Sequence, residues 1–91
     1  MSYRLTKQAL ADIDHIAVYT QEQHPEHGER IGRAFEDCFE LLAHFPKLGR
    51  SGPRPGTREF PMRQYPFVVI FRVGSGVTEI LRVYHMARVR K

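Results

Sequence analysis

The chain has 91 residues, 42% of them hydrophobic and 26% charged, and this size and composition predict one folded domain spanning residues 1–91. Its one cysteine, Cys38, excludes an intrachain disulfide, so we expect a protein of a reducing compartment, the cytoplasm. We expect neither a secretory signal nor a membrane helix, because no apolar stretch approaches the roughly 20 residues that span a bilayer.

Charge is distributed unevenly along the chain. Residues 1–45 carry four basic and eight acidic side chains, a net charge of −4, whereas residues 46–91 carry ten basic and two acidic ones, a net charge of +8. Eleven of the fourteen basic residues are arginines, whose planar guanidinium suits bidentate contacts with carboxylates or phosphates. The pattern is compatible with ordinary surface solubility, but it also indicates an acidic partner for the second half of the chain.

The first half predicts a short strand followed by two helices. Residues 2–6 alternate in polarity, and Thr6 is suited to cap a helix that begins at Lys7. Apolar residues then recur at steps of three and four until His24, where the following Pro25 ends the helix. Pro25 is expected to begin a second helix, whose apolar seam should pack on the first helix as an antiparallel hairpin. That seam consists of Ile31, Phe35, Cys38, Leu42 and Phe45.

A loop and an edge strand are expected next. Residues 46–57 contain six prolines or glycines in twelve positions, which is typical of a loop. Residues 58–65 have strand character, but they include Pro61 and precede Pro66. Because proline cannot donate a hydrogen bond to a neighbouring strand, this segment is predicted to lie at an edge of the sheet.

The last third of the chain predicts a β-hairpin. Residues 67–73 and 77–85 are rich in β-branched and apolar side chains and are separated only by Gly74-Ser75-Gly76. Both runs are apolar at odd and even positions, so both faces should be covered, one by the helices and the other by a partner. The predicted fold class is therefore α+β, in the order β-α-α-β-β-β, with a helical hairpin packed on a mainly antiparallel sheet.

Neither a cofactor nor a metal ion is expected. The chain has no glycine-rich phosphate loop, no dinucleotide fingerprint and no paired cysteines. His24 and His27 are three residues apart, but only carboxylates such as Glu26 lie near enough in sequence to complete a ligand set. Cys38 falls in the apolar seam, which favours a core residue over a nucleophile.

The chain resembles the ParE toxins of the RelE/ParE toxin–antitoxin superfamily. The resemblance is carried by an ordered set of short segments that covers nearly the whole chain. The segments are residues 5–9, Asp12-Ile13, FPKLG at 45–49, RPGTREF at 54–60, VVIFRV at 68–73 and TEILRVYHMAR at 78–88.

This resemblance implies a cytoplasmic toxin neutralised by a ParD-like antitoxin, which has a DNA-binding part and a flexible segment that wraps the toxin. ParE-like toxins poison DNA gyrase and so stop replication, whereas RelE-like toxins cut mRNA on the ribosome. Both groups share the fold, so the fold does not choose between the two activities. Under the ParE reading, DNA is met only indirectly, through the antitoxin or gyrase, and no membrane is involved.

Partner-binding residues are expected in the basic half of the chain. The arginines would bind acidic groups of the antitoxin, or their stems would pack on apolar surface while their heads reach water. An inward-facing arginine would need an acid of the same chain, such as Glu59 or Glu79. The basic C-terminal tail, residues 88–91, is a candidate contact for gyrase or DNA. The predicted set is Arg58, Phe60, Arg72, Arg82, Tyr84, His85, Arg88 and Arg90.

A gyrase inhibitor needs no catalytic residue, so none is expected under this interpretation. If the chain were instead a nuclease, His85 would transfer protons while arginines held the phosphate. The lysine-rich pattern of RelE-like nucleases is absent, although some relatives rely on a Glu–Arg–His set. The alternative catalytic set is His85, Arg58, Arg82 and Arg88.

Overall fold

The computed structural model describes the backbone of residues 2–89 and the side chains of residues 2–87. Within this range the chain forms five strands and three α-helices, joined in part by two short 3-10 turns at Pro25–His27 and Pro46–Leu48. In chain order the elements are β1 (Ser2–Leu5), α1 (Lys7–Gln23), α2 (Gly28–His44), β2 (Arg50–Ser51), β3 (Arg58–Pro61), β4 (Phe67–Val73), β5 (Val77–His85) and α3 (Met86–Val89).

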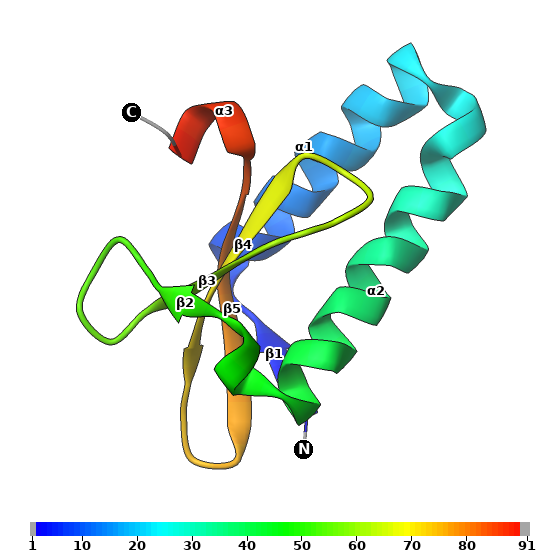
Figure 1. The fold of residues 1–91 in the computed structure, drawn as a ribbon. Helices are drawn as coiled ribbons and strands as arrows, with labels where there is room; N and C mark the ends of the chain where they lie inside the picture. Colours follow the sequence, from blue (N-terminus) through cyan, green and yellow to red (C-terminus); the bar gives the residue numbers. More distant parts are fainter. Residues whose placement is uncertain (1, 90–91) are drawn as a thin grey trace.

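The strands form one sheet in the order β1-β5-β4-β3-β2. β1 runs parallel to β5, and the other pairs are antiparallel. Helices α1 and α2 form a hairpin that lies on one side of this sheet (Figure 1). The predicted α+β class and its mainly antiparallel sheet are therefore confirmed.

Three boundaries differ from the sequence-based expectation. The segment predicted as an edge strand is shorter, and it is not an edge, because the two-residue strand β2 pairs with β3 inside the predicted loop. Pro25 begins a 3-10 turn, and α2 itself begins at Gly28. The prediction that Phe45 belongs to the apolar seam of the second helix is wrong, because α2 ends at His44 and Phe45 is 60% exposed.

The helices pack on the sheet through one continuous core. Thr6 caps α1 as predicted, since its hydroxyl accepts the Ala9 N–H at 3.1 Å, and the same hydroxyl donates to the carbonyl of Leu81 at 2.9 Å. A single side chain thus fixes both the start of α1 and its position beside β5. The buried core includes Ala9, Ile31, Phe35, Cys38, Phe39, Leu42, Val69, Phe71, Ile80 and Val83.

The β4–β5 hairpin contains a register shift between Ile70 and Phe71. On the other strand, Ile80 and Val83 both belong to the core although they are three residues apart. An ordinary strand would place such residues on opposite faces, so the bulge allows β5 to direct both toward the helices.

The sheet face away from the helices is not an open apolar surface. Val68 and Ile70 alternate with the core residues Val69 and Phe71, and yet both are buried. Their cross-strand neighbours have long side chains, among them Tyr84 beside Val68 and Arg82 beside Ile70. The expected cover on this side is therefore supplied, at least for these two residues, by the chain itself. No helix among residues 2–89 is long and apolar enough to cross a membrane.

Candidate partner-binding surfaces

Asp12 of α1 organises the end of β5. Its carboxylate accepts hydrogen bonds from Arg82 Nε at 2.8 Å, from Arg82 Nη2 at 3.1 Å and from the Val83 backbone N–H at 2.9 Å. β1 ends at Leu5, opposite Ile80, so Asp12 occupies the strand edge that β1 leaves uncovered. The hydrogen bonds that Arg82 donates to Asp12 raise the pKa of Arg82 above its ordinary value, and Arg82 therefore stays cationic.

The Arg82 guanidinium also lies over the ring of Tyr84, 4.7 Å from the ring centroid. This is a cation–π geometry, and it leaves Arg82 about one-third exposed. Two of the predicted partner-binding residues are thus joined in one platform whose orientation Asp12 fixes.

A groove of about 560 Å³ lies between α1 and the C-terminal part of β5. Apolar and aromatic side chains dominate it, and Tyr19 on its helical side is 59% exposed. The groove is lined by Ala11, Asp12, His15, Ile16, Tyr19, Phe67, Val83, Tyr84 and His85.

His85 stands at the end of β5, where the chain turns into α3. Its Nδ1 atom accepts the Ala87 N–H at 3.2 Å, and its ring meets the ring of Phe67 edge-on at 5.6 Å. The first contact requires Nδ1 without a proton, which leaves Nε2 as the nitrogen that carries one in the neutral ring. His85 thus serves as a local cap for the turn into α3.

Arg72 lies in an ion-pair cluster on the sheet face away from the helices. Its guanidinium contacts Glu79, which also accepts a hydrogen bond from Arg4 at 3.0 Å. The hydrogen bonds from Arg72 and then Arg4 lower the pKa of Glu79, so this carboxylate stays ionised into the acid range. Nearby, Arg50 binds Glu59 at 2.7 Å. Each carboxylate is largely covered, while its arginines remain more than half exposed.

Arg58 is committed to the chain's own backbone. Its Nη2 donates to the carbonyl of Gly49 at 2.5 Å and to that of Lys47 at 3.3 Å. A Cβ at Gly49 would lie 2.6 Å from the ring of Phe71, so glycine is needed for this close approach. Arg58 pairs across the sheet with the core residue Phe71, and it therefore lies on the opposite face from Arg72.

The predicted residues thus fall into separate places. Arg82 and Tyr84 share with Arg72 the sheet face away from the helices, although the Arg82 guanidinium reaches Asp12 of α1. His85 lies at the end of β5, and Arg58 braces the segment after α2. Phe60 is half-buried against the core and borders a groove beside α2. The structure describes no side chain for Arg88, and Arg90 lies outside the described residues.

Sequence reasoning missed the acid that binds Arg82. Glu79 forms an ion pair with Arg72, as the sequence suggested, but Arg82 forms its ion pair with Asp12. A signal existed, because Asp12 borders the buried stripe of α1 between Ala9 and Ile16. A carboxylate at such a position is expected to find a donor.

The family assignment follows from comparison with known proteins. A family model described as the ParE toxin of the type II toxin–antitoxin system parDE matches residues 3–90. The chain belongs to the ParE toxin family. The RelE/ParE-like arrangement of a helical hairpin on a mainly antiparallel sheet agrees with this assignment.

Among the relatives of this chain, Toxin ParE1 of Caulobacter vibrioides is 33% identical over 88 residues, covering 93% of this chain and 88% of the relative. Putative toxin Y4kP of Sinorhizobium fredii is 32% identical over 82 residues, covering 90% and 84%. Toxin RelE2 of C. vibrioides is 30% identical over 83 residues, covering 91% and 92%, so both toxin names occur among the relatives.

Solved structures agree on the fold. A chain from the chromosomal ParDE system of P. aeruginosa superimposes with a TM-score of 0.82 at 27% identity, covering 93% of this chain and 95% of that one. A chain from the RelBE2 complex of Mycobacterium tuberculosis gives a TM-score of 0.58 at 22% identity, covering 92% and 95%, and supports the fold alone.

Proposed function

We propose that this ParE family member is a cytoplasmic inhibitor of DNA gyrase that stops replication until a ParD-like antitoxin neutralises it. The observation that carries the proposal is the match of residues 3–90 to the toxin of the parDE system. The superposition on a chain of a ParDE system supports an antitoxin as the partner.

The geometry of the arginines favours this proposal over the mRNA endonuclease. Cleavage of RNA needs a base, an acid and cations gathered around one phosphate. Here Arg58 is bound to backbone carbonyls, and Arg82 is held by Asp12. Two cations of the alternative catalytic set are therefore already engaged, in different parts of the sheet.

The antitoxin is proposed to contact the Arg82–Tyr84 platform and the Arg72 cluster with acidic groups. The exposed edges of Arg4, Arg50 and Arg72 can each donate hydrogen bonds to a further carboxylate. Apolar side chains of the antitoxin would fill the groove between α1 and β5.

The test is a comparison of two purified reactions. We expect the toxin to inhibit supercoiling of relaxed plasmid by gyrase, and we expect its antitoxin to restore activity at equimolar amounts. A parallel reaction with ribosomes and mRNA should show no cleavage. Early ribosome-dependent cuts with unimpaired supercoiling would replace this proposal by the endonuclease.

A further inference from the structure

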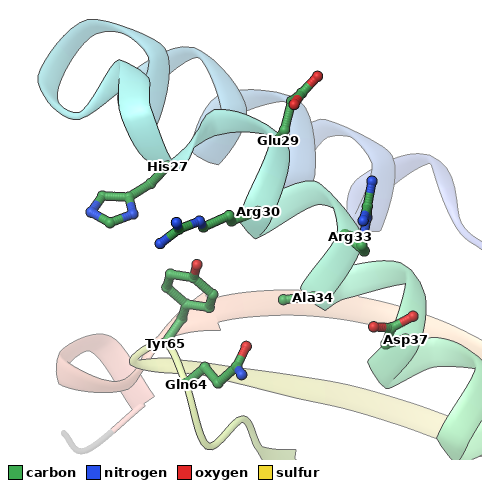
Figure 2. Close-up of a pocket in the computed structure, with 8 residues that line it drawn as sticks. All are labelled: His27, Glu29, Arg30, Arg33, Ala34, Asp37, Gln64 and Tyr65. Carbon is green, nitrogen blue, oxygen red and sulfur yellow. The ribbon is translucent and has the colours of Figure 1, made fainter.

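A second pocket, separate from the predicted set, lies between the start of α2 and the segment that connects β3 to β4 (Figure 2). Its volume is about 630 Å³. His27, Arg30 and Arg33 belong to the helical side, and Gln64 and Tyr65 to the facing segment. Arg30 and Arg33 thus belong to residues 1–45, the half of the chain whose net charge is negative.

Three polar side chains, those of His27, Arg30 and Tyr65, converge in this pocket. Figure 2 shows the guanidinium of Arg30 reaching toward the hydroxyl of Tyr65, with the ring of His27 beside it. Glu29 points away from them, although it directly precedes Arg30 in the chain. The ring of Tyr65 packs on the core and is half-buried, so its hydroxyl is held in place.

The Nε2 atom of His27 lies 3.8 Å from a carboxylate oxygen of Glu26, but the other two side chains have no acceptor of their own within the described residues. Among the described residues, Arg30 has no ion pair, and the Tyr65 hydroxyl has no hydrogen-bond partner. The Nδ1 atom of His27 is buried without a partner in the same range. By contrast, Arg72 and Arg82 on the sheet are both paired with carboxylates. Glu29 and Asp37 also line the pocket, but within the described residues neither carboxylate is paired with Arg30 or bonded to the Tyr65 hydroxyl.

We propose that this pocket binds one carboxylate of the antitoxin, which accepts hydrogen bonds from Arg30 and the Tyr65 hydroxyl, with His27 beside them. The inference rests on the proposed function, since it names a contact of that same partner. A planar guanidinium beside a fixed hydroxyl matches the two oxygens of a carboxylate.

The surroundings favour a protein carboxylate over a nucleic-acid phosphate. A second pocket lies beside α2 and shares Ala34 and Gln64 with the first. Its lining includes the apolar side chains of Leu41, Phe60 and Met62. An amphipathic helix or turn can place an acidic side chain in the first pocket and apolar ones in the second. A polynucleotide would instead bring repeated charge past Asp37, which stands in the walls of both pockets.

The outer edge of β3 also indicates which kind of antitoxin segment can bind beside it. β3 offers Pro61 at its outer edge beyond the β2 pair, and proline has no N–H to donate. An added strand would therefore find a gap in the ladder at this point. A segment bound through its side chains, such as a helix, meets no such obstacle.

The test measures antitoxin dissociation from three toxin variants, with the wild type as reference. Arg30→Ala removes the main cation, and Tyr65→Phe removes one hydroxyl while keeping the packed ring. Arg54→Ala is the control, because it deletes the same charge from an exposed loop that does not line the pocket. We expect dissociation to become about 10-fold faster or more for Arg30→Ala and a few-fold faster for Tyr65→Phe, with Arg54→Ala within about twofold.

Substitution of antitoxin acids one at a time completes the experiment. One acidic position should show no further loss when it is combined with Arg30→Ala, which identifies the bound carboxylate. Equal dissociation rates for Arg30→Ala, Tyr65→Phe and Arg54→Ala would overturn the inference while leaving the proposed function in place. Loss of binding to a 30-base-pair duplex, with unchanged antitoxin binding, would overturn it in favour of a phosphate. Failure of the wild type both to bind antitoxin and to inhibit gyrase would remove the proposed function, and this inference with it.

Discussion

Asp12 and Arg82, 70 positions apart in the chain, join the first helix to the last strand through two hydrogen bonds. The same carboxylate accepts a hydrogen bond from the Val83 backbone N–H. β1 ends opposite Ile80, so the carboxylate supplies the acceptor that a further residue of β1 would otherwise provide to the edge of β5. One side chain therefore closes the sheet edge and directs a guanidinium onto Tyr84.

Asp12→Asn is expected to lower the free energy of unfolding by about 1–3 kcal/mol, because it weakens a charge-assisted pair and the capping of a backbone donor. The effect should lie near the lower end, since Arg82 is about one-third exposed and solvent screens the pair. Urea denaturation measures the change. Asp14→Asn, an exposed carboxylate on the same helix, is the matched control and should change stability by less than about 0.5 kcal/mol. Equal losses in both variants would contradict a specific role for Asp12.

Periodicity predicted the elements that are long enough to have a period. The stripe of α1 and the seam of α2 repeat over several turns, so their buried faces could be read directly. The two runs of the hairpin are apolar at odd and even positions, so they predicted strands but not which face of each strand meets the helices. The capping role of Thr6 also followed from residue type, since a hydroxyl before a helical pattern accepts the free N–H groups of the first turn.

The contacts that depend on how elements cross could not be predicted in this way. β2 has two residues and no period, and it exists because β3 offers it an edge. The Asp12–Arg82 pair depends on where α1 crosses β5, which sequence spacing does not encode. The pocket of Arg30 and Tyr65 depends similarly on the path of the segment after β3, and the acidic net charge of the first half gives no sign of it.

Glu79 should give the stability a defined pH dependence. Its pKa is lowered from 4.5 by hydrogen bonds from Arg72 and then Arg4, so its contribution is present above the unfolded-state pKa. That contribution is lost as the pH falls below 4.5 through the lowered pKa. We expect the difference in melting temperature between wild type and Glu79→Gln to shrink across this window. A difference that stays constant from about pH 6 to about pH 3 would contradict the linkage.

Cys38 should be unreactive in the folded protein. Burial in the core raises the pKa of its thiol to about 12, so the nucleophilic thiolate is scarce near neutral pH. We expect a thiol-specific chromogenic reagent at about pH 8 to label the native chain only as fast as the core opens, and to label it rapidly in denaturant. Rapid labelling of the native chain would show that the helix–sheet core is loose around α2.

His85→Gln separates the two proposed activities. Glutamine keeps an acceptor that can bind the Ala87 N–H, so the turn into α3 should survive. A gyrase inhibitor should therefore retain its activity within a few-fold in the supercoiling assay. A nuclease that used His85 for proton transfer would lose about 10²–10⁴-fold in rate, and such a loss in a ribosome-dependent assay would favour the alternative.

The antitoxin should stabilise the toxin strongly. Seven large apolar side chains are exposed within the described residues, among them Leu41, Phe45 and Leu48, and a chain of this size has a limited core. A partner that binds only the native state adds about 2.7 kcal/mol at 100 times its dissociation constant, which for a domain of this size corresponds to about 10 °C or more in melting temperature. Thermal melts with the full antitoxin, and with an antitoxin that lacks its flexible wrapping segment as the control, measure this. Only the full antitoxin should shift the midpoint. Superimposable melts at saturating, independently verified binding would show that the exposed apolar residues are not the contact surface.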